Sequence, residues 1–552
     1  MLRLVSFAFV SLMLAMSVAA CIGPSEPAVA TPPRDIAIAY DPSKARLFED
    51  LVNTYNGKAT IKVRGLKMET PQLLDALPKG EMVGVSPDSS IWLENLDKAW
   101  EAGHPGAPSI VGTTVRYAAT PVVIALWRGS AGGLGPADQQ GWASLLRKGS
   151  EDSSFHWSHG SPRASASGML ALVAEFYAGA GKTYGLTKDD ADREDVRRYV
   201  TQIEKTIARY GGEGDAALVE YLLKEGQKAL SATVMPEASV FDFNQRSRSA
   251  KLDAIYPAEG TLMLDHPLVL LETPELTPDQ RRAFLEFSRF LTGPDGQAIV
   301  VKHGFRSVDL AFDMAKSPLK NEGLSIEQPR LLQMPAAGTL AYLRTAWAYG
   351  LKRRANIVIV ADVSGSMEGD KLTRAKEALG SFIKQAPSDE ERIGLVTFSS
   401  DYQEAVALDR LGANRGELLR RIDGLAAGGN TALYYATWRA HRLLAQRRDA
   451  ERINVVVVMT DGNENASRSF SERPVVGIGL VPRIATESSS DIGPLVAAMK
   501  REGQNILVFA VAYGSDADLN MLSSLAGAFG GQAYRADPDT IRRLYELISQ
   551  NF

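Results

Sequence analysis

Three short motifs in this 552-residue chain carry oxygen donors of the kind that bind metal ions. The segment Asp-x-Ser-x-Ser holds Asp362, Ser364 and Ser366, and the motifs Gly-Gly-Asn-Thr and Thr-Asp-Gly add Thr431 and Asp461. Hard divalent cations prefer oxygen ligands, and Mg²⁺ takes them in near-octahedral geometry while keeping some bound water. The motifs therefore predict a divalent-cation site, foremost for Mg²⁺, with Mn²⁺ or Ca²⁺ as alternatives. The lack of histidine and cysteine in the set argues against zinc there.

Two carboxylates and three neutral hydroxyls leave such a cation under-neutralised and with an open coordination position. A carboxylate from a partner protein would suit that position. The residues alone leave two alternatives open, a metal that only stabilises the domain and metal-assisted catalysis. Against catalysis, the chain has no Gly-x4-Gly-Lys-Ser/Thr phosphate loop and no second carboxylate cluster for a two-metal site. We therefore expect no enzymatic activity.

The segments that must position these motifs lie within residues 355–552, which we expect to form one domain. Four apolar runs there have the length and β-branched character of strands covered on both faces: 357–360, 394–398, 455–459 and 506–511. Helical periodicity separates them, for example at Leu372, Ala375 and Leu379. The pattern predicts an α/β fold with a doubly wound parallel sheet, which binds ligands at the carboxyl ends of its strands. Two of the three motifs directly follow such strands.

Residues 356–550 resemble a von Willebrand factor type A domain, and the five oxygen-donor residues match its metal-ion-dependent adhesion site in order and context. The resemblance implies that the two serines and the threonine touch the metal directly. It implies that the two aspartates act directly or through water. An acidic side chain of a protein partner is expected to complete the coordination.

Residues 35–310 form an earlier region in which strand-like runs, such as 36–40 and 121–126, alternate with helical stretches, such as 197–209. This alternation also indicates an α/β class. The region resembles a bacterial extracellular solute-binding protein, through residues 36–56, 84–92, 119–125 and 161–168. The resemblance implies a two-lobed, hinged, periplasmic-binding-protein-like fold with a ligand cleft between the lobes.

Polar residues in these segments are the candidates for lining that cleft. The run Ser-Pro-Arg-Ala-Ser-Ala-Ser-Gly precedes an apolar helix, and a helix N-terminus favours an anionic or polar ligand. The candidates are Ser86, Thr120, Ser165, Ser167 and Glu237. Each also has an ordinary structural interpretation, since serine is a common helix N-cap and turn residue.

His156 and His159 have a spacing that could suit a metal pair. The surrounding sequence offers no cysteine and no obvious third ligand, so we expect surface or core histidines.

Residues 311–354 are predicted to link the two regions. They contain several prolines and then an amphipathic stretch around Leu340, Leu343 and Trp347. We expect a short helix there that docks on the C-terminal domain.

The N-terminus predicts export and anchoring. Residues 1–20 combine a basic start, an apolar core and small residues before Cys21, as in a secretory signal peptide. The ending resembles a bacterial lipobox, which implies lipidation of Cys21, the only cysteine in the chain. Residues 21–34 then suit a proline-rich tether. More than one acyl chain would anchor the protein stably to a membrane of the bacterial cell envelope, outside the cytoplasm.

Composition excludes several other classes. The 61 basic and 65 acidic residues give a formal charge of −4, which disfavours nucleic-acid binding through an overall positive charge. A single cysteine rules out a disulfide framework within the chain.

These observations predict a lipid-anchored extracytoplasmic binding protein. Its C-terminal domain would engage a protein partner through the divalent cation, and its N-terminal region would sense a small polar or anionic ligand or act as a scaffold. The alternative is a solute receptor for a membrane transporter, with the C-terminal domain as a docking accessory. A metal-linked assembly factor for an envelope complex would share the same chemistry.

Overall fold

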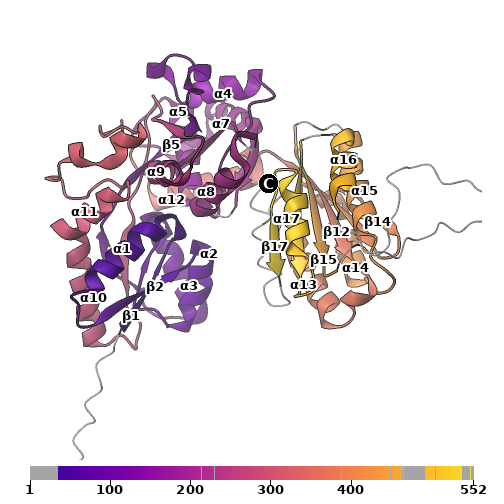
Figure 1. Ribbon diagram of the computed structural model, residues 1–552, viewed down its shortest axis with the longest axis horizontal. Helices are drawn as coiled ribbons and strands as arrows, with labels where there is room; N and C mark the ends of the chain where they lie inside the picture. The colour runs from indigo at the N-terminus through magenta and orange to yellow at the C-terminus, as the bar shows by residue number, and fades with distance from the viewer. Residues whose placement is uncertain are drawn as a thin grey trace, which may run out of the picture.

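The computed structural model describes residues 35–552 except 213, 229, 387, 448, 450, 463, 465–490, 504, 537–547 and 549–552. Three β-sheets organise this part of the chain, two in the N-terminal region and one in the C-terminal region (Figure 1). The predicted signal peptide, Cys21 and the tether lie outside the described residues. Among the described helices, none is long and apolar enough to cross a membrane.

The first lobe is built on a five-stranded sheet of order β2-β1-β3-β11-β4. The strands are β1 (Asp35–Tyr40), β2 (Lys62–Lys67), β3 (Gly84–Ser86), β4 (Val111–Arg116) and β11 (Pro267–Leu271). The helices are α1 (Ala45–Asn56), α2 (Thr70–Ala76), α3 (Leu93–Gly103), α10 (Pro278–Thr292) and α11 (Pro294–Lys302). The predicted strand at 36–40 is confirmed, and its five residues are buried between helices on both faces.

The second lobe has a sheet of order β10-β5-β8-β6-β7, with β9 also paired to β5. Its strands are β5 (Thr120–Trp127), β6 (Trp157–Gly160), β7 (Ile207–Gly211), β8 (Ala232–Pro236), β9 (Leu252–Ile255) and β10 (Met263–Leu264). Its helices are α4 (Trp142–Glu151), α5 (Ala166–Ala180), α6 (Lys188–Asp192), α7 (Glu194–Thr206), α8 (Gly214–Glu225) and α9 (Glu237–Arg246). The chain crosses between the lobes after β4 and again after β10, which gives the two-lobed arrangement expected from the sequence.

One predicted element of this lobe is wrong at its end. The helix expected over 197–209 stops at Thr206, and Ile207–Gly211 forms the edge strand β7. Ile207 and Tyr210 are fully buried there, and the strand pairs in parallel with β6. Pairing with the sheet and burial of these two side chains override the helical pattern.

The linker helix α12 (Ala337–Ala346) continues into a π-helical turn, Trp347–Leu351. It packs on the second lobe, and not on the C-terminal domain as the sequence suggested. Tyr342 donates its hydroxyl to Asp192, and the Trp347 ring meets the Tyr210 ring edge-on at 5.2 Å between centroids. The amphipathic stretch correctly indicated a helix with one buried face, but this face and the π-helical turn cover α5, α6 and α7.

The C-terminal domain is a six-stranded sheet of order β14-β13-β12-β15-β16-β17. Its strands are β12 (Ala355–Asp362), β13 (Arg392–Phe398), β14 (Tyr402–Arg410), β15 (Ile453–Thr460), β16 (Ile506–Tyr513) and β17 (Ala533–Ala536). Its helices are α13 (Asp370–Gln385), α14 (Leu411–Asp423), α15 (Leu433–Arg447), α16 (Gly493–Glu502) and α17 (Leu519–Gly527).

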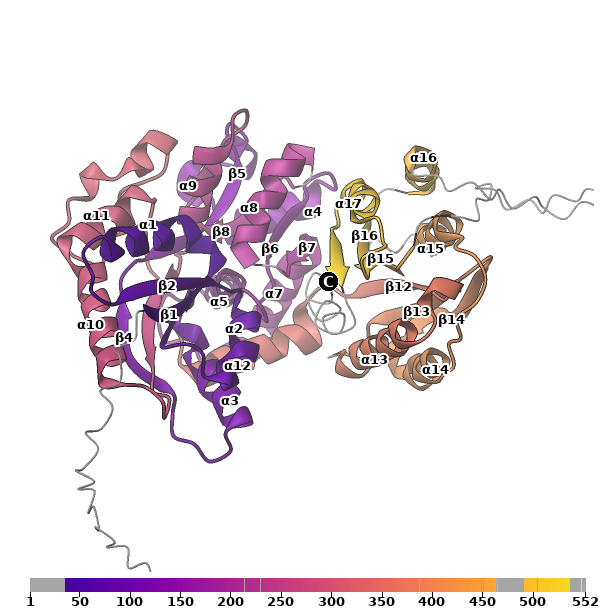
Figure 2. The same ribbon diagram turned by 60° about the horizontal axis from the view of Figure 1, so that its bottom comes forward.

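Both faces of this sheet are covered, as the continuous apolar runs predicted (Figure 2). Ile357 and Ile359 pack with α13 and α14 on one face, whereas Val358 and Val360 pack with α15, α16 and α17 on the other. All neighbouring strands are parallel except β14, which runs antiparallel to β13 at the edge. The sheet is therefore doubly wound with one antiparallel edge strand.

The C-terminal domain lies against the second lobe. Arg209 in β7 donates a hydrogen bond of 2.6 Å to the carbonyl of Gly530, and its guanidinium stacks on Tyr221 at 4.1 Å. Arg353, just before β12, donates to the carbonyl of Ile207 at 2.6 Å. A cavity of about 770 Å³ lies beside these contacts and is lined by both domains.

Candidate metal-binding and ligand-binding sites

The three oxygen-donor motifs meet at one edge of the C-terminal sheet. Asp362 is the last residue of β12, and the helical turn Gly365–Met367 follows it at once. Asp461 directly follows β15, the strand beside β12, and Thr431 lies just before α15. The amide of Gly365 donates to the Gly429 carbonyl at 3.0 Å, which ties the first motif to the threonine loop.

The side chains of these motifs form a continuous polar cluster. Ser364 and Ser366 place their hydroxyl oxygens 3.1 Å apart, and Ser366 donates to Oδ1 of Asp461 at 2.6 Å. The hydroxyls of Ser366 and Thr431 both face Gly462, where a β-carbon would lie 3.8 and 3.9 Å from them. The backbone amide of Ser364 donates to Oδ1 of Asp362 at 2.8 Å. All five predicted side chains are therefore brought together.

Burial makes this cluster favourable for a cation. Both aspartates are almost fully buried, whereas Ser366 is exposed, so the cluster opens to solvent on one side. Burial raises the pKa of Asp362 to about 6, although hydrogen bonds from Ser364 and Thr460 oppose the shift. The charge of Asp461 raises it further. A divalent cation would relieve both the burial cost and the repulsion, so the donor set fits such an ion.

The sequence did not single out one charged group of this site. Lys371, in the first turn of α13, places Nζ 2.6 Å from Oδ2 of Asp461. Its position nine residues after Asp362 is a weak signal, because a lysine near a helix start is normally solvated.

A second polar cluster lies where the two N-terminal lobes face each other. Asp41 and Asp88 come from the first lobe, and Asp215 comes from the start of α8 in the second. All three are nearly buried. Burial raises the pKa of Asp215 to about 7, and the Asp41 charge adds to the shift. Burial, then the charges of Asp41 and Asp215, hold the pKa of Asp88 well above its usual range.

Lys44 is the basic group of this cluster. Its Nζ donates to the Pro87 carbonyl at 2.6 Å and lies 3.5 Å from Nδ1 of His266. Burial lowers the pKa of Lys44 to about 8, against the opposing charges of nearby aspartates. The raised pKa values favour the protonated forms of Asp88 and Asp215, so the cluster presents hydrogen-bond donors as well as acceptors.

Two of the five candidate ligand residues adjoin this cluster. Ser167 donates to Oδ1 of Asp215 at 2.7 Å, and Ser165 caps α5 by accepting from the Gly168 amide at 3.2 Å. The two serine hydroxyls lie 2.8 Å apart.

The other three are held by partners inside the protein. Ser86 donates to the Pro267 carbonyl at 2.8 Å, and Thr120 accepts from the Ala238 amide at 3.0 Å. Glu237 forms a buried ion pair with Arg306 at 2.8 Å.

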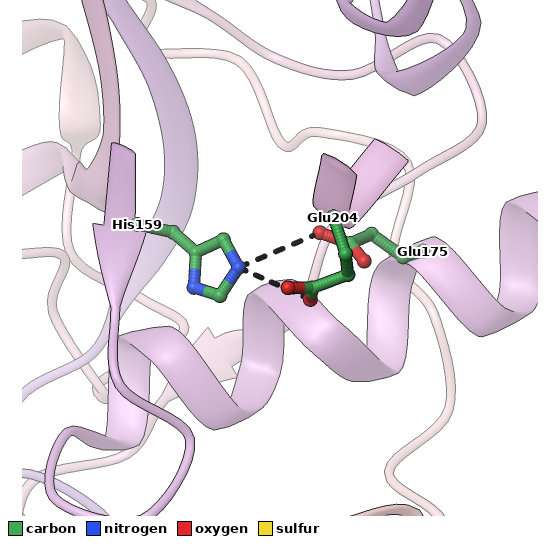
Figure 3. Close-up of side chains that lie close together, drawn as sticks. All are labelled: His159, Glu175 and Glu204. Carbon is green, nitrogen blue, oxygen red and sulfur yellow. Dashed lines mark hydrogen bonds and ion pairs between the residues drawn. The ribbon is translucent and has the colours of Figure 1, made fainter. Parts of the chain in front are cut away.

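The structure also brings two acidic side chains to His159. Glu175 and Glu204 lie beside its imidazole inside the second lobe (Figure 3). Of the two positions expected for the histidines, surface or core, His159 takes the core. Its carboxylate neighbours lie on two later helices, and no local sequence pattern joins them to it.

Comparison with known proteins agrees with this two-part architecture. Residues 36–306 match the family model of bacterial extracellular solute-binding proteins, and residues 356–545 match that of the von Willebrand factor type A domain. A mouse protein named calcium-activated chloride channel regulator 3A-1 is 25% identical over 213 residues. This match covers 37% of the chain and only 23% of the mouse protein.

Solved structures resemble each part separately. A periplasmic thiamin binding protein covers 57% of this chain and 93% of its own, with 12% identity and a TM-score of 0.43. A von Willebrand factor type A protein from Catenulispora acidiphila covers 36% of this chain and 42% of its own, with 18% identity and a TM-score of 0.29.

Proposed function

We propose that this chain is a lipid-anchored extracytoplasmic binding protein that binds a protein partner through a divalent cation. It consists of a solute-binding domain followed by a von Willebrand factor type A domain. The observation that carries the proposal is the meeting of five oxygen-donor side chains at one sheet edge, with Ser366 open to solvent. Both domain families are usually non-catalytic, and the proposed role is binding.

The cation would be held by Ser364, Ser366 and Thr431 directly, with Asp362 and Asp461 acting directly or through water. When bound, it supplies a positive centre for a carboxylate of the partner. The protein's own contribution is to fix the donors. Asp362 is oriented by the Ser364 amide and by the Thr460 hydroxyl, which donates to Oδ2 at 2.6 Å. Mg²⁺ is the preferred ion because all the donors are oxygen.

Export and anchoring belong to the same proposal. Solute-binding proteins of this family are extracellular, which fits a signal peptide over residues 1–20 and lipidation at Cys21. Replacing Cys21 with serine is expected to move the protein from the membrane fraction to the soluble extracytoplasmic fraction. Retention in the membrane fraction would argue against the lipid anchor.

The N-terminal region is proposed to take a small polar or anionic ligand between its two lobes. The supporting observation is the cluster of buried polar side chains where the lobes meet, which comprises Asp41, Lys44, Asp88 and Asp215. A ligand site between the lobes also supports the second candidate function, a solute receptor for a transporter. A thermal-shift screen of cationic and anionic metabolites, on the unsubstituted protein and on Asp215→Asn, tests the ligand class.

The partner hypothesis is tested by affinity capture from native membranes. Tagged full-length protein and Asp362→Ala would each be used with Mg²⁺ and with EDTA. We expect one partner that appears only with the unsubstituted protein and Mg²⁺. Asp409→Ala, an exposed position on the edge strand β14, is the matched control and is expected to keep the partner. The same proteins in all samples would contradict the proposal.

A further inference from the structure

A second cluster of metal-ligand type lies inside the second lobe, far in sequence from the type A motifs. His159 comes from β6, Glu175 from α5 and Glu204 from α7, and all three side chains are fully buried. One ligand atom from each lies within 4.8 Å of the others. Figure 3 shows the imidazole pointing at both carboxylates, with Nε2 3.4 Å from Glu204 and 3.8 Å from Glu175.

The charges of this cluster are not balanced by a basic residue. Among the described residues, the only ion-pair partner of Glu175 and of Glu204 is His159. Neither carboxylate oxygen of Glu175 receives a hydrogen bond from an N–H or hydroxyl donor. Burying two carboxylates side by side without a cation is costly. The carboxylate of the fully buried Glu175 therefore faces a position that a cation would stabilise.

Hydrogen bonds from neighbouring groups orient the imidazole and the Glu204 carboxylate for metal binding. Nδ1 of His159 lies 2.6 Å from the Gly160 carbonyl, so Nδ1 carries the proton and donates it there. Nε2 is the ring atom that faces the two carboxylates. Tyr210 donates its hydroxyl to the second oxygen of Glu204 at 2.5 Å. Hydrogen bonds of this kind, behind the ligand atoms, fix the imidazole tautomer and carboxylate orientation in metal sites.

We propose that His159, Glu175 and Glu204 form a structural site for a divalent transition-metal ion, with Zn²⁺ as the best fit. Bonds of about 2.0–2.1 Å to a tetrahedral Zn²⁺ place neighbouring ligand atoms about 3.4 Å apart. The distances from Nε2 to the two carboxylates, 3.4 and 3.8 Å, are close to that value. An imidazole ligand favours zinc or a similar ion over Mg²⁺ and Ca²⁺.

The site has a direct connection to the type A domain. Tyr210, which bonds Glu204, also accepts a hydrogen bond of 3.0 Å from the backbone amide of Arg353. Arg353 stands at the end of the linker, just before β12. A metal ion that fixes Glu204 would therefore also fix Tyr210 and the point where the chain enters the type A domain. The role of the ion is to join the two domains.

Zinc retention in the full-length protein tests the site. The protein would carry Asp461→Asn, so that the type A site contributes as little as possible. After chelation, incubation with Zn²⁺ alone and removal of excess metal, we expect about one equivalent per chain for a single site. Glu175→Gln and Glu204→Gln should each lose it, with an affinity drop larger than the about 10–100-fold typical of removing an outer-shell partner. His156→Ala, three residues from His159, is the control and should retain zinc.

X-ray absorption on the Asp461→Asn protein gives a readout that does not depend on whether the glutamine variants fold. We expect one imidazole nitrogen and otherwise oxygen ligands. A folded Asp461→Asn protein that retains no zinc would overturn the proposal and leave a cluster that shares protons. Zinc without an imidazole ligand, or zinc retained equally by folded Glu175→Gln, would also overturn it. None of these outcomes depends on the partner proposed for the type A domain.

Discussion

Lys371 and Asp461 form an ion pair in which each carboxylate oxygen has a separate partner. Nζ of Lys371 lies 2.6 Å from Oδ2, and the Ser366 hydroxyl donates to Oδ1 at 2.6 Å. Lys371 also lies 3.9 Å from Asp516, an exposed side chain on the next loop of the same sheet edge. A fixed positive charge therefore stands beside the proposed cation and competes with it for Asp461.

Replacing Lys371 with methionine is expected to tighten Mg²⁺ binding. The lysine side chain is 31% exposed, so its repulsion of the cation is screened and on the order of 1 kcal/mol. We expect the affinity for Mg²⁺, measured by calorimetry, to rise about three- to tenfold, with a smaller gain at high salt. Lys376→Met, on the same helix with Nζ bonded to the Asp423 carbonyl, should leave the affinity unchanged. Weaker binding in Lys371→Met would mean that the lysine mainly positions Asp461.

The sequence predicted that the oxygen donors would meet because two of the motifs follow strands, and the carboxyl ends of parallel strands lie at one sheet edge. Asp362 and Asp461 needed only that rule. Lys371 did not follow from it. A cation in the first turn of a helix opposes the helix dipole, and it is stable here because Asp461 holds it.

Elsewhere, the sequence could not predict which helix faces pack against each other. The amphipathic stretch around Leu343 indicated a buried face but not which domain would cover it. His159 was expected at the surface or in the core with no further ligand nearby, because Glu175 and Glu204 lie on separate helices whose facing sides depend on tertiary packing. No local pattern could have joined the three. The same applies to Glu237, because its partner Arg306 lies 69 residues later.

Glu237 is expected to contribute to stability more than to ligand binding. Arg306 donates to its two oxygens at 3.0 and 2.8 Å, and both side chains are buried. Glu237→Gln leaves a buried guanidinium without its counter-charge, so we expect a loss of about 3–5 kcal/mol in the free energy of unfolding of the N-terminal domain. Chemical denaturation measures this. Glu286→Gln, exposed on α10, should have almost no effect.

The double variant Glu237→Met with Arg306→Met separates charge from packing, because it removes both members of the pair. It should recover most of the lost stability. A Glu237→Gln protein as stable as the unsubstituted one would favour the original assignment of Glu237 to the ligand site.

Arg353 is expected to couple the two domains. Its guanidinium donates to the Ile207 carbonyl of the second lobe at 2.6 Å and reaches the Glu451 carbonyl beside β15 at 3.4 Å. Arg353→Met removes these charged hydrogen bonds, each of which contributes about 1.5–3 kcal/mol. We expect faster proteolysis of the linker and two separated unfolding transitions in calorimetry. Arg392→Met is the control, since its side chain pairs with Asp449 within the type A domain. Equal proteolysis of the two variants would contradict this role.

His441, on α15, is expected to make the type A domain sensitive to acid. Burial lowers its pKa to about 4, and neither ring nitrogen has a hydrogen-bond partner. In the unfolded chain a histidine has a pKa of about 6.5. Below that pH, His441 therefore binds a proton in the unfolded state that it does not bind in the folded state. The stabilisation is complete above pH 6.5 and is lost as the pH falls toward 4. The expected loss is about 3 kcal/mol.

His441→Leu isolates this contribution, because His441 is the only histidine within residues 355–552. Asp362 has the opposite effect over part of the range, since burial raises its pKa to about 6 and its protonation favours the folded state. The relevant quantity is therefore the difference between the two proteins, measured by urea unfolding at pH 7, 5.5 and 4. We expect His441→Leu to gain about 3 kcal/mol relative to the unsubstituted domain as the pH falls. Parallel stability curves would show that the imidazole is already solvated in the folded domain.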